Sequence, residues 1–339
     1  MINNINILHP PNNTLLNDMI DSAKNEIILS RHSIPSMAFC QKIINAKSRG
    51  VKVYILLSSP YFFQENSNDT ISKLYGIHSE IVQYSQSIAK KRSEYITKLT
   101  QGGIYPKYID HRKFFLNHSM YMVIDSNLLY IGSAPNENSD RLDVGFSSND
   151  ATIIKTLKHL FDIDYHETKN NINIPNKSGI AIAPNNMRSV LMNVINSAKN
   201  SIYMMFPVVT DDPGILSALK NQLDKGVTIK MLCSPEIISI DRESGLNYSL
   251  IRHLVNIGVS LRESYSPKIH CRCIITDNNS HDNSHLYIGS GNLKTHSLDY
   301  SREVGIVFKN SAFSKKMTQL FDDIWDREKE WNTLYKRQN

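Results

Sequence analysis

Two histidines, His118 and His270, are each followed seven residues later by an aspartate, Asp125 and Asp277. Each His-to-Asp interval is rich in apolar and β-branched residues, so we expect both histidines to lie on β-strands. A lone histidine on such a strand is ordinarily a satisfied core residue. Two with the same spacing predict chemistry instead, because imidazole can act as nucleophile, acid or base near neutral pH.

Further polar residues follow each histidine in the same order. Side chains alternate across a strand, so Arg272 shares a face with His270, whereas Met120 takes the corresponding position after His118. The later runs are Gly132-Ser133-Ala134-Pro135-Asn136 with Asp143-Val144-Gly145 in the first half, and Gly289-Ser290-Gly291-Asn292 with Glu303-Val304-Gly305 in the second.

The chain is an internal duplication. Ser22-Ala23-Lys24-Asn25 recurs as Ser197-Ala198-Lys199-Asn200, and Arg49-Gly50-Val51 recurs as Lys225-Gly226-Val227. Amphipathic helices alternate with short apolar strands in both copies, which predicts two similar α/β/α units with mixed sheets flanked by helices. We expect a first repeat over residues 1–166, a linker over 167–178 and a second repeat over 179–339. Lys90-Lys91-Arg92, in an insertion of the first half, is expected to be a solvated helix face.

These runs resemble the phospholipase D superfamily, whose signature is His-x-Lys-x4-Asp, followed by Gly-Ser-x-Asn and a later Glu-x-Gly. The second half departs from it by Arg272 for lysine. The first half departs by Met120, by Pro135, and by Asp143 for glutamate. The resemblance covers nearly the whole chain and implies a phosphodiesterase with its active site between the two halves. Such an enzyme needs no metal or other cofactor and works through a phosphohistidine.

The resemblance also implies a role for each residue. His118 would attack phosphorus and His270 would protonate the leaving oxygen, while Glu303 and Asp143 would orient the two imidazoles. Asp125 and Asp277 end their strands and are expected to support the structure around the site. The groups expected to hold phosphate are Arg272, Ser133, Asn136, Ser290 and Asn292, with Lys113 as the cation that would replace the one missing at Met120.

Composition narrows the class of protein. The 339 residues include 38 Lys and Arg against 32 Asp and Glu, a net charge of +6, and 41% hydrophobic residues, which excludes disorder and fibrous repeats. Four cysteines without paired spacing predict reduced thiols rather than disulfides or a zinc site. The lack of a secretory signal or a long apolar run predicts a cytoplasmic protein with no transmembrane segment, and leaves peripheral membrane contact open.

The resemblance favours a phospholipid as substrate, with both half-sites in one monomer. The same superfamily includes nucleases, so nucleic acid stays an alternative substrate. A different class of function is a degenerate protein that binds phosphate groups or a partner without turnover, because Met120, Pro135 and Arg272 all depart from the signature.

Overall fold

The computed structural model describes residues 3–8, 14–58, 79–133, 140–168, 172–175, 178–234, 246–277 and 284–328. Its first sheet has the strand order β1-β7-β6-β5-β2-β3-β4. These strands are β1 (Asn3–Leu8), β2 (Glu26–Ser30), β3 (Lys52–Leu57), β4 (Lys107–Tyr108), β5 (Tyr121–Ile124), β6 (Leu128–Gly132) and β7 (Arg141–Ser148).

The second sheet repeats this order as β8-β15-β14-β13-β9-β10-β11. Its strands are β8 (Ile180–Ala183), β9 (Ser201–Met205), β10 (Thr228–Cys233), β11 (Ser260–Glu263), β13 (Arg272–Thr276), β14 (Leu286–Gly289) and β15 (Glu303–Phe308). In both sheets a parallel part joins an antiparallel part, at β2 and β5 in the first and at β9 and β13 in the second. The predicted mixed α/β class and the duplication are therefore confirmed.

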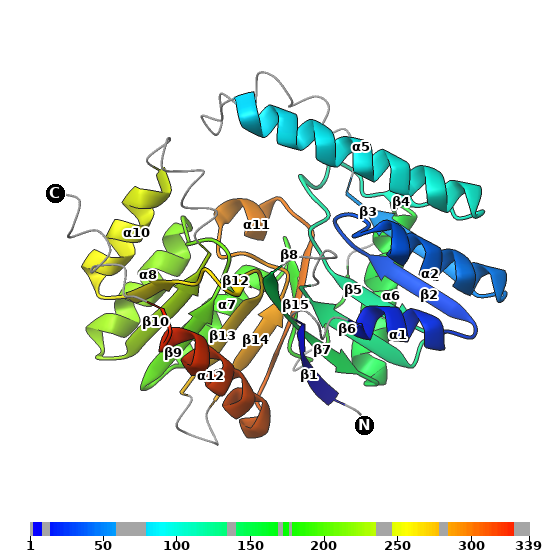
Figure 1. Cartoon of the computed structure of the whole chain (residues 1–339). Helices are drawn as coiled ribbons and strands as arrows, with labels where there is room; N and C mark the ends of the chain where they lie inside the picture. The colour runs from blue at the N-terminus through cyan, green and yellow to red at the C-terminus, as the bar shows by residue number, and fades with distance from the viewer. Residues whose placement is uncertain are drawn as a thin grey trace.

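Helices cover the outer face of each sheet (Figure 1). The helices of the first half are α1 (Leu15–Ser22), α2 (Met37–Ser48), α5 (Ser79–Gln101) and α6 (Ala151–Tyr165). Those of the second are α7 (Met187–Ser197), α8 (Pro213–Asp224), α10 (Leu246–Ile257), α11 (Thr295–Asp299) and α12 (Ser311–Trp325). The long helix α5 packs on α2 and has no counterpart of similar length in the described part of the second half.

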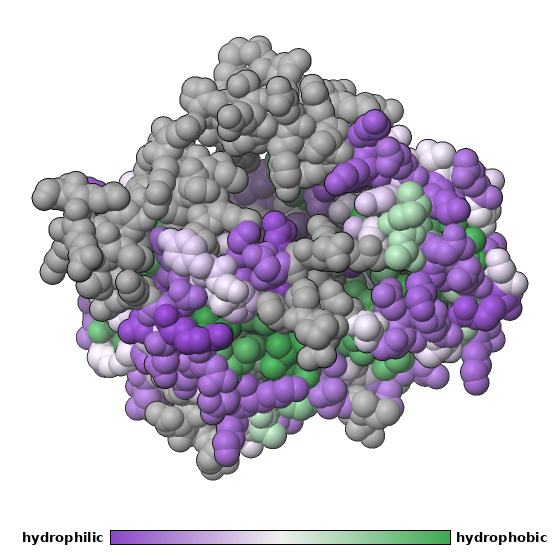
Figure 2. Space-filling model, viewed as in Figure 1, coloured by the Kyte–Doolittle hydropathy of each residue, from purple (hydrophilic) through white to green (hydrophobic). Residues whose placement is uncertain are grey.

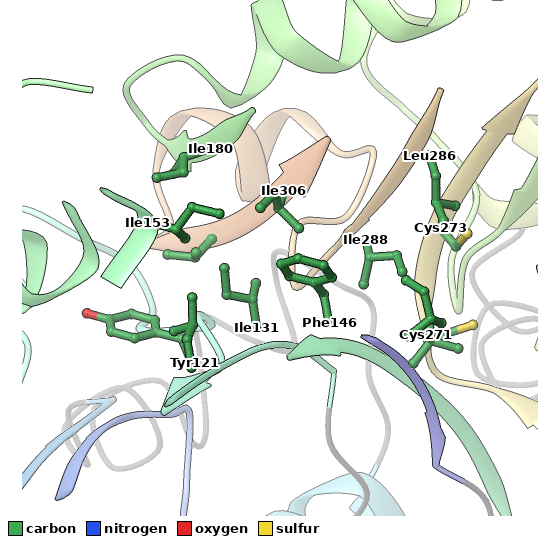
Figure 3. Close-up of a cluster of buried hydrophobic side chains, with 14 of the residues drawn as sticks. Tyr121, Ile131, Phe146, Ile153, Ile180, Cys271, Cys273, Leu286, Ile288 and Ile306 are labelled. Carbon is green, nitrogen blue, oxygen red and sulfur yellow. The ribbon is translucent and has the colours of Figure 1, made fainter. Parts of the chain in front are cut away.

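The two sheets share one hydrophobic core, which joins the halves. Phe146 of the first sheet lies against Ile288 and Ile306 of the second (Figure 3). Helices α6 and α12 close this core, and separate clusters fill the space between each sheet and its outer helices. Hydrophilic side chains cover much of the face seen in Figure 2, with hydrophobic residues reaching the surface near its centre. Such a shared core fixes the halves relative to each other.

The motif aspartates, Asp125 and Asp277, bind the backbone at the start of a neighbouring strand. Asp125 accepts hydrogen bonds of 2.7–2.9 Å from the backbone N–H groups of residues 24–26, at the start of β2. Asp277 makes the same bonds to residues 199–201, at the start of β9. Each carboxylate satisfies amides that a strand beginning would otherwise leave unpaired.

Among the described residues, none of the helices is both long enough and apolar enough to span a membrane.

Candidate active site

The two histidines lie just before the strands on which the sequence placed them. Strand β5 begins at Tyr121 and β13 at Arg272, so the prediction of histidines within strands is wrong. The reason is that the backbone leaves its own sheet here to pair with the other half. The His118 N–H donates to the Arg302 carbonyl, and the His270 N–H donates to the Leu142 carbonyl, each over 3.0 Å.

Each histidine is paired with a carboxylate from the opposite half. His118 Nδ1 lies 2.9 Å from both carboxylate oxygens of Glu303, and His270 Nδ1 lies 2.6 Å from Asp143 Oδ1. The sequence predicted these carboxylates as orienting groups but not that the pairs cross between repeats. Since Nδ1 is engaged in each pair, Nε2 is the ring nitrogen that can meet a substrate.

Burial differs sharply between the members of each pair. The side chains of His118 and His270 are 23% and 28% exposed, whereas those of Glu303 and Asp143 are 1% and 0% exposed. A buried carboxylate is costly unless it accepts several hydrogen bonds. Both imidazoles therefore sit at the surface of a site whose anchoring groups lie beneath it.

Serine hydroxyls complete the environment of Glu303. Ser290 Oγ donates to Glu303 Oε2 over 2.6 Å, and Ser297 Oγ of α11 donates to Oε1. Ser290 also accepts a bond from the Val304 N–H, as Ser133 does from the Val144 N–H. The two motif serines thus brace the strands that carry the carboxylates, a role the sequence had not suggested. Ser297 was missed because nothing in its spacing marks it.

The pKa shifts of Asp143 and His270 both favour an ionised carboxylate beside a neutral imidazole. Burial opposes ionisation of Asp143, but His270, the Ser133 hydroxyl and Arg272 together hold its pKa below the usual value. Burial lowers the pKa of His270, with Asp143 opposing and Arg272 adding to the effect. The neutral imidazole is therefore the favoured form at neutral pH in the free protein.

Arg272 is a buried cation beside His270. It is 5% exposed, its Nε donates to Asn292 Oδ1 over 3.0 Å, and it also donates to the His270 carbonyl. Burial lowers its pKa, while the negative charges of Glu303 and Asp143 both raise it. The charges of both buried carboxylates thus act on this one guanidinium.

Two motif glycines allow tyrosines to pack against the carboxylate strands. A Cβ on Gly145 would lie 2.2 Å from the Tyr130 ring, and a Cβ on Gly305 would lie 2.5 Å from the Tyr287 ring. Neither contact is possible for a larger residue without moving the ring. The glycine after each carboxylate is therefore explained by packing.

Three residues around His118 and Met120 were not identified as site residues from the sequence. The His32 ring centroid lies 6.0 Å from that of His118, and Arg92 of α5 donates to His32 Nε2 over 3.0 Å. Burial lowers the pKa of His32 well below its usual value, and the charges of Arg92 and His118 lower it further. Lys90 and Lys91 are exposed, as expected. The expectation that Arg92 also lies on a solvated face is wrong, because its side chain is partly buried against His32. The third residue is Arg31, which contacts Met120.

One of the predicted phosphate-binding residues, Lys113, stands apart from the residues around His270. Lys113 is exposed and lines a pocket of about 360 Å³ together with Asp164 and Arg302. Asn136 lies outside the described residues. Arg272 and Asn292 of the predicted set meet beside His270, as the bonds above show.

The arrangement can perform acid–base and nucleophilic chemistry. Two imidazoles, each oriented through Nδ1, and a buried guanidinium form the kind of site that stabilises a phosphoryl group in transfer. In the described part of the chain, no three His, Cys, Asp or Glu side chains group as metal ligands.

The chain is similar in sequence to known cardiolipin synthases. The chain is 25% identical to a cardiolipin synthase of Clostridium perfringens (strain SM101), over 64% of this chain and 51% of the relative. It is 22% identical to cardiolipin synthase A of Wigglesworthia glossinidia brevipalpis, over 93% of this chain and 67% of the relative. The chain thus spans about half the length of the Clostridium relatives it matches.

The solved structure of phosphatidylserine synthase from Haemophilus influenzae has the same fold, with a TM-score of 0.66 at 10% identity over 96% of this chain and 87% of the other. A family model described as "Cardiolipin synthase, PLD-like domain" matches residues 16–164 and 191–325, and so takes in both histidines and both carboxylates. The chain belongs to this family of phospholipase D-like domains.

Proposed function

We propose that this protein is a phospholipase D-type enzyme that cleaves a phospholipid phosphodiester and transfers the phosphatidyl group to water or an alcohol. The observation that carries the proposal is the crossed pairing of His118 with Glu303 and of His270 with Asp143. Such a pairing makes each half incomplete alone and gives one site with two oriented imidazoles. Family membership and the names of the relatives support the lipid substrate.

The proposed reaction has two displacements at phosphorus. Nε2 of one histidine attacks, the Nε2–P bond forms, the bond from phosphorus to the leaving oxygen breaks, and the other histidine gives that oxygen a proton. Water or an alcohol then attacks phosphorus from the side that the leaving group vacated. Its proton passes to the second histidine as the P–N bond breaks. Arg272 holds the non-bridging oxygens throughout.

We assign the attack to His118 and the proton transfer to His270, following the family resemblance. The rival is the reverse assignment, which the lowered pKa of His270 favours because attack needs a neutral ring. Locating the covalent adduct separates them, since it forms on the attacking histidine.

A substrate panel tests the function. Purified protein is incubated with vesicles of phosphatidylglycerol, vesicles of a choline phospholipid, a fluorogenic phosphodiester and single-stranded DNA. We expect release or exchange of the headgroup from lipid and no DNA cleavage, with His118→Ala and His270→Ala inactive. Cleavage of DNA alone would reassign the substrate. Binding of phospholipid without turnover of any diester would show the non-catalytic alternative.

A further inference from the structure

Met120 occupies the position in the first half that Arg272 holds in the second. The Met120 carbonyl accepts from the Gly132 N–H over 3.1 Å, and Arg272 is paired with Gly289 in the equivalent register. Met120 is 5% exposed and carries no charge. The first half therefore lacks a cation at the place where the second half has one.

A guanidinium reaches the same place from the neighbouring strand. Ser30 of β2 pairs with Tyr121 of β5, so the next residues outward, Arg31 and Met120, are cross-strand neighbours. Arg31 Nη1 lies 3.8 Å from Met120 Sδ. Its Nε donates to the Ser33 carbonyl over 2.8 Å, which fixes the direction of the side chain.

The second half has the same two positions with the residue types exchanged. Met205 of β9 pairs with Cys273 of β13, which makes Phe206 and Arg272 the corresponding neighbours. Phe206 is fully buried. Each half thus has one arginine and one apolar side chain at this step of the sheet, with the arginine on β13 in one half and directly after β2 in the other.

The electrostatic surroundings of the two arginines match. Arg31 is 6% exposed and Arg272 is 5% exposed. Burial lowers the pKa of Arg31 to about 10, against the opposing charge of Asp143, so Arg31 is a cation at neutral pH. The charges of Glu303 and Asp143 oppose the effect of burial on the pKa of Arg272 in the same way. Both guanidiniums therefore lie within the field of Asp143, the partner of His270.

We propose that Arg31 is the phosphate-binding cation of the first half, having taken over from another strand the task that Met120 cannot perform. The inference rests on the proposed function, because it assumes that a phosphodiester occupies the site between the histidines. Two guanidiniums, one from each repeat, would then bind the two non-bridging oxygens of a single phosphodiester.

Binding of inorganic phosphate, measured by titration calorimetry, tests the assignment without requiring turnover. Arg31→Met and Arg272→Met are each expected to weaken binding by about 10- to 100-fold, the range for loss of a charge-assisted hydrogen bond. The exchange variant Arg31→Met/Met120→Arg, which gives the first half the pattern of the second, is expected to recover affinity to within about threefold. Arg252→Met, an exposed arginine on α10, controls for the change in net charge.

The outcomes separate this inference from the function. Normal phosphate affinity in Arg31→Met, with loss in Arg272→Met, would overturn the role of Arg31 alone, as would an exchange variant that folds but does not recover. A wild-type protein that binds no phosphate would overturn the phosphate site and the proposed function together. If Arg31→Met does not fold, Arg31→Gln provides the same test, because it keeps a donor near Ser33 and removes the charge.

Discussion

Replacing Glu303 with Gln is a demanding test of the crossed pairs. The change keeps the shape of the side chain but replaces the carboxylate, which only accepts hydrogen bonds, with an amide. Both oxygens of Glu303 lie 2.9 Å from His118 Nδ1, and Ser290 and Ser297 each donate to one of them. An amide offers one oxygen and one NH₂ group to the same three partners. Its NH₂ can therefore donate to Nδ1 and stabilise the tautomer with the proton on Nε2, where attack on phosphorus needs a lone pair.

The expected loss in kcat is about 10⁴-fold, the value for the same carboxylate-to-amide change in a Ser-His-Asp triad, or about 5.4 kcal/mol at 1.36 kcal/mol per decade. Headgroup release from vesicles measures it, and the thermal unfolding midpoint shows that the variant is folded. Asp143→Asn should cause a similar loss through His270. Because both carboxylates serve one reaction, the double variant should lose far less than the product of the single losses.

Exposed Glu94 of α5 offers a matched control, since Glu94→Gln makes the same chemical change away from the site. A folded Glu303→Gln enzyme that keeps more than about a tenth of wild-type kcat would refute the orienting role. Fully multiplicative losses in the double variant would refute the single composite site.

Further predictions follow from the same geometry. Activity should survive EDTA, and loss that a divalent ion restores would show a metal requirement. As pH falls from 7 toward 5.5, the unfolded chain takes up protons that buried His32 cannot, so the free energy of unfolding should fall, by up to about 1.4 kcal/mol per pH unit for this one residue. Denaturant unfolding should show a shallower pH dependence in His32→Gln and an unchanged one in His159→Gln, an exposed site on α6; equal slopes would contradict the assignment. Asp277→Ala should cost roughly 2–4 kcal/mol of stability, because it frees the amides at the start of β9, while activity per folded molecule is retained. A stable Asp277→Ala protein with no activity would place Asp277 in the chemistry.

Much of the fold was accessible from the sequence because it depends on local patterns. The duplicated helix and strand signals predicted two mixed sheets flanked by helices, and the structure has them. These features rest on periodicity and turn residues, which neighbouring positions determine.

The crossing of the pairs was not accessible, because it depends on how the sheets pack. Spacing alone is satisfied equally well if Asp143 serves His118 of its own half. The backbone bonds of His118 to Arg302 and of His270 to Leu142 bring each histidine to the other repeat, and these are contacts between segments far apart in the chain. Local propensity carries no information about such long-range pairs.

The missing cation illustrates the same limit. The sequence directed attention to Lys113, the nearest cation upstream of the motif. A neighbour across a sheet is set by strand register, however, and that register puts Arg31 beside Met120. Arg92 was expected to face solvent because it belongs to the charge run Lys90-Lys91-Arg92, yet its position on α5 directs it to His32.

The most direct test of the central claim is to trap the covalent intermediate and find its position. Enzyme mixed rapidly with phospholipid is quenched in base, which preserves a P–N bond, then digested and mapped by mass spectrometry. We predict one phosphatidyl group per chain, on the peptide that contains His118. The adduct should accumulate in His270→Ala when the substrate has an activated leaving group that needs no proton. It should be absent in His118→Ala. An adduct confined to His270 would reverse the two roles within the same site. Adducts on both histidines of one chain, or turnover by either half with the other histidine removed, would contradict a single site built from crossed pairs.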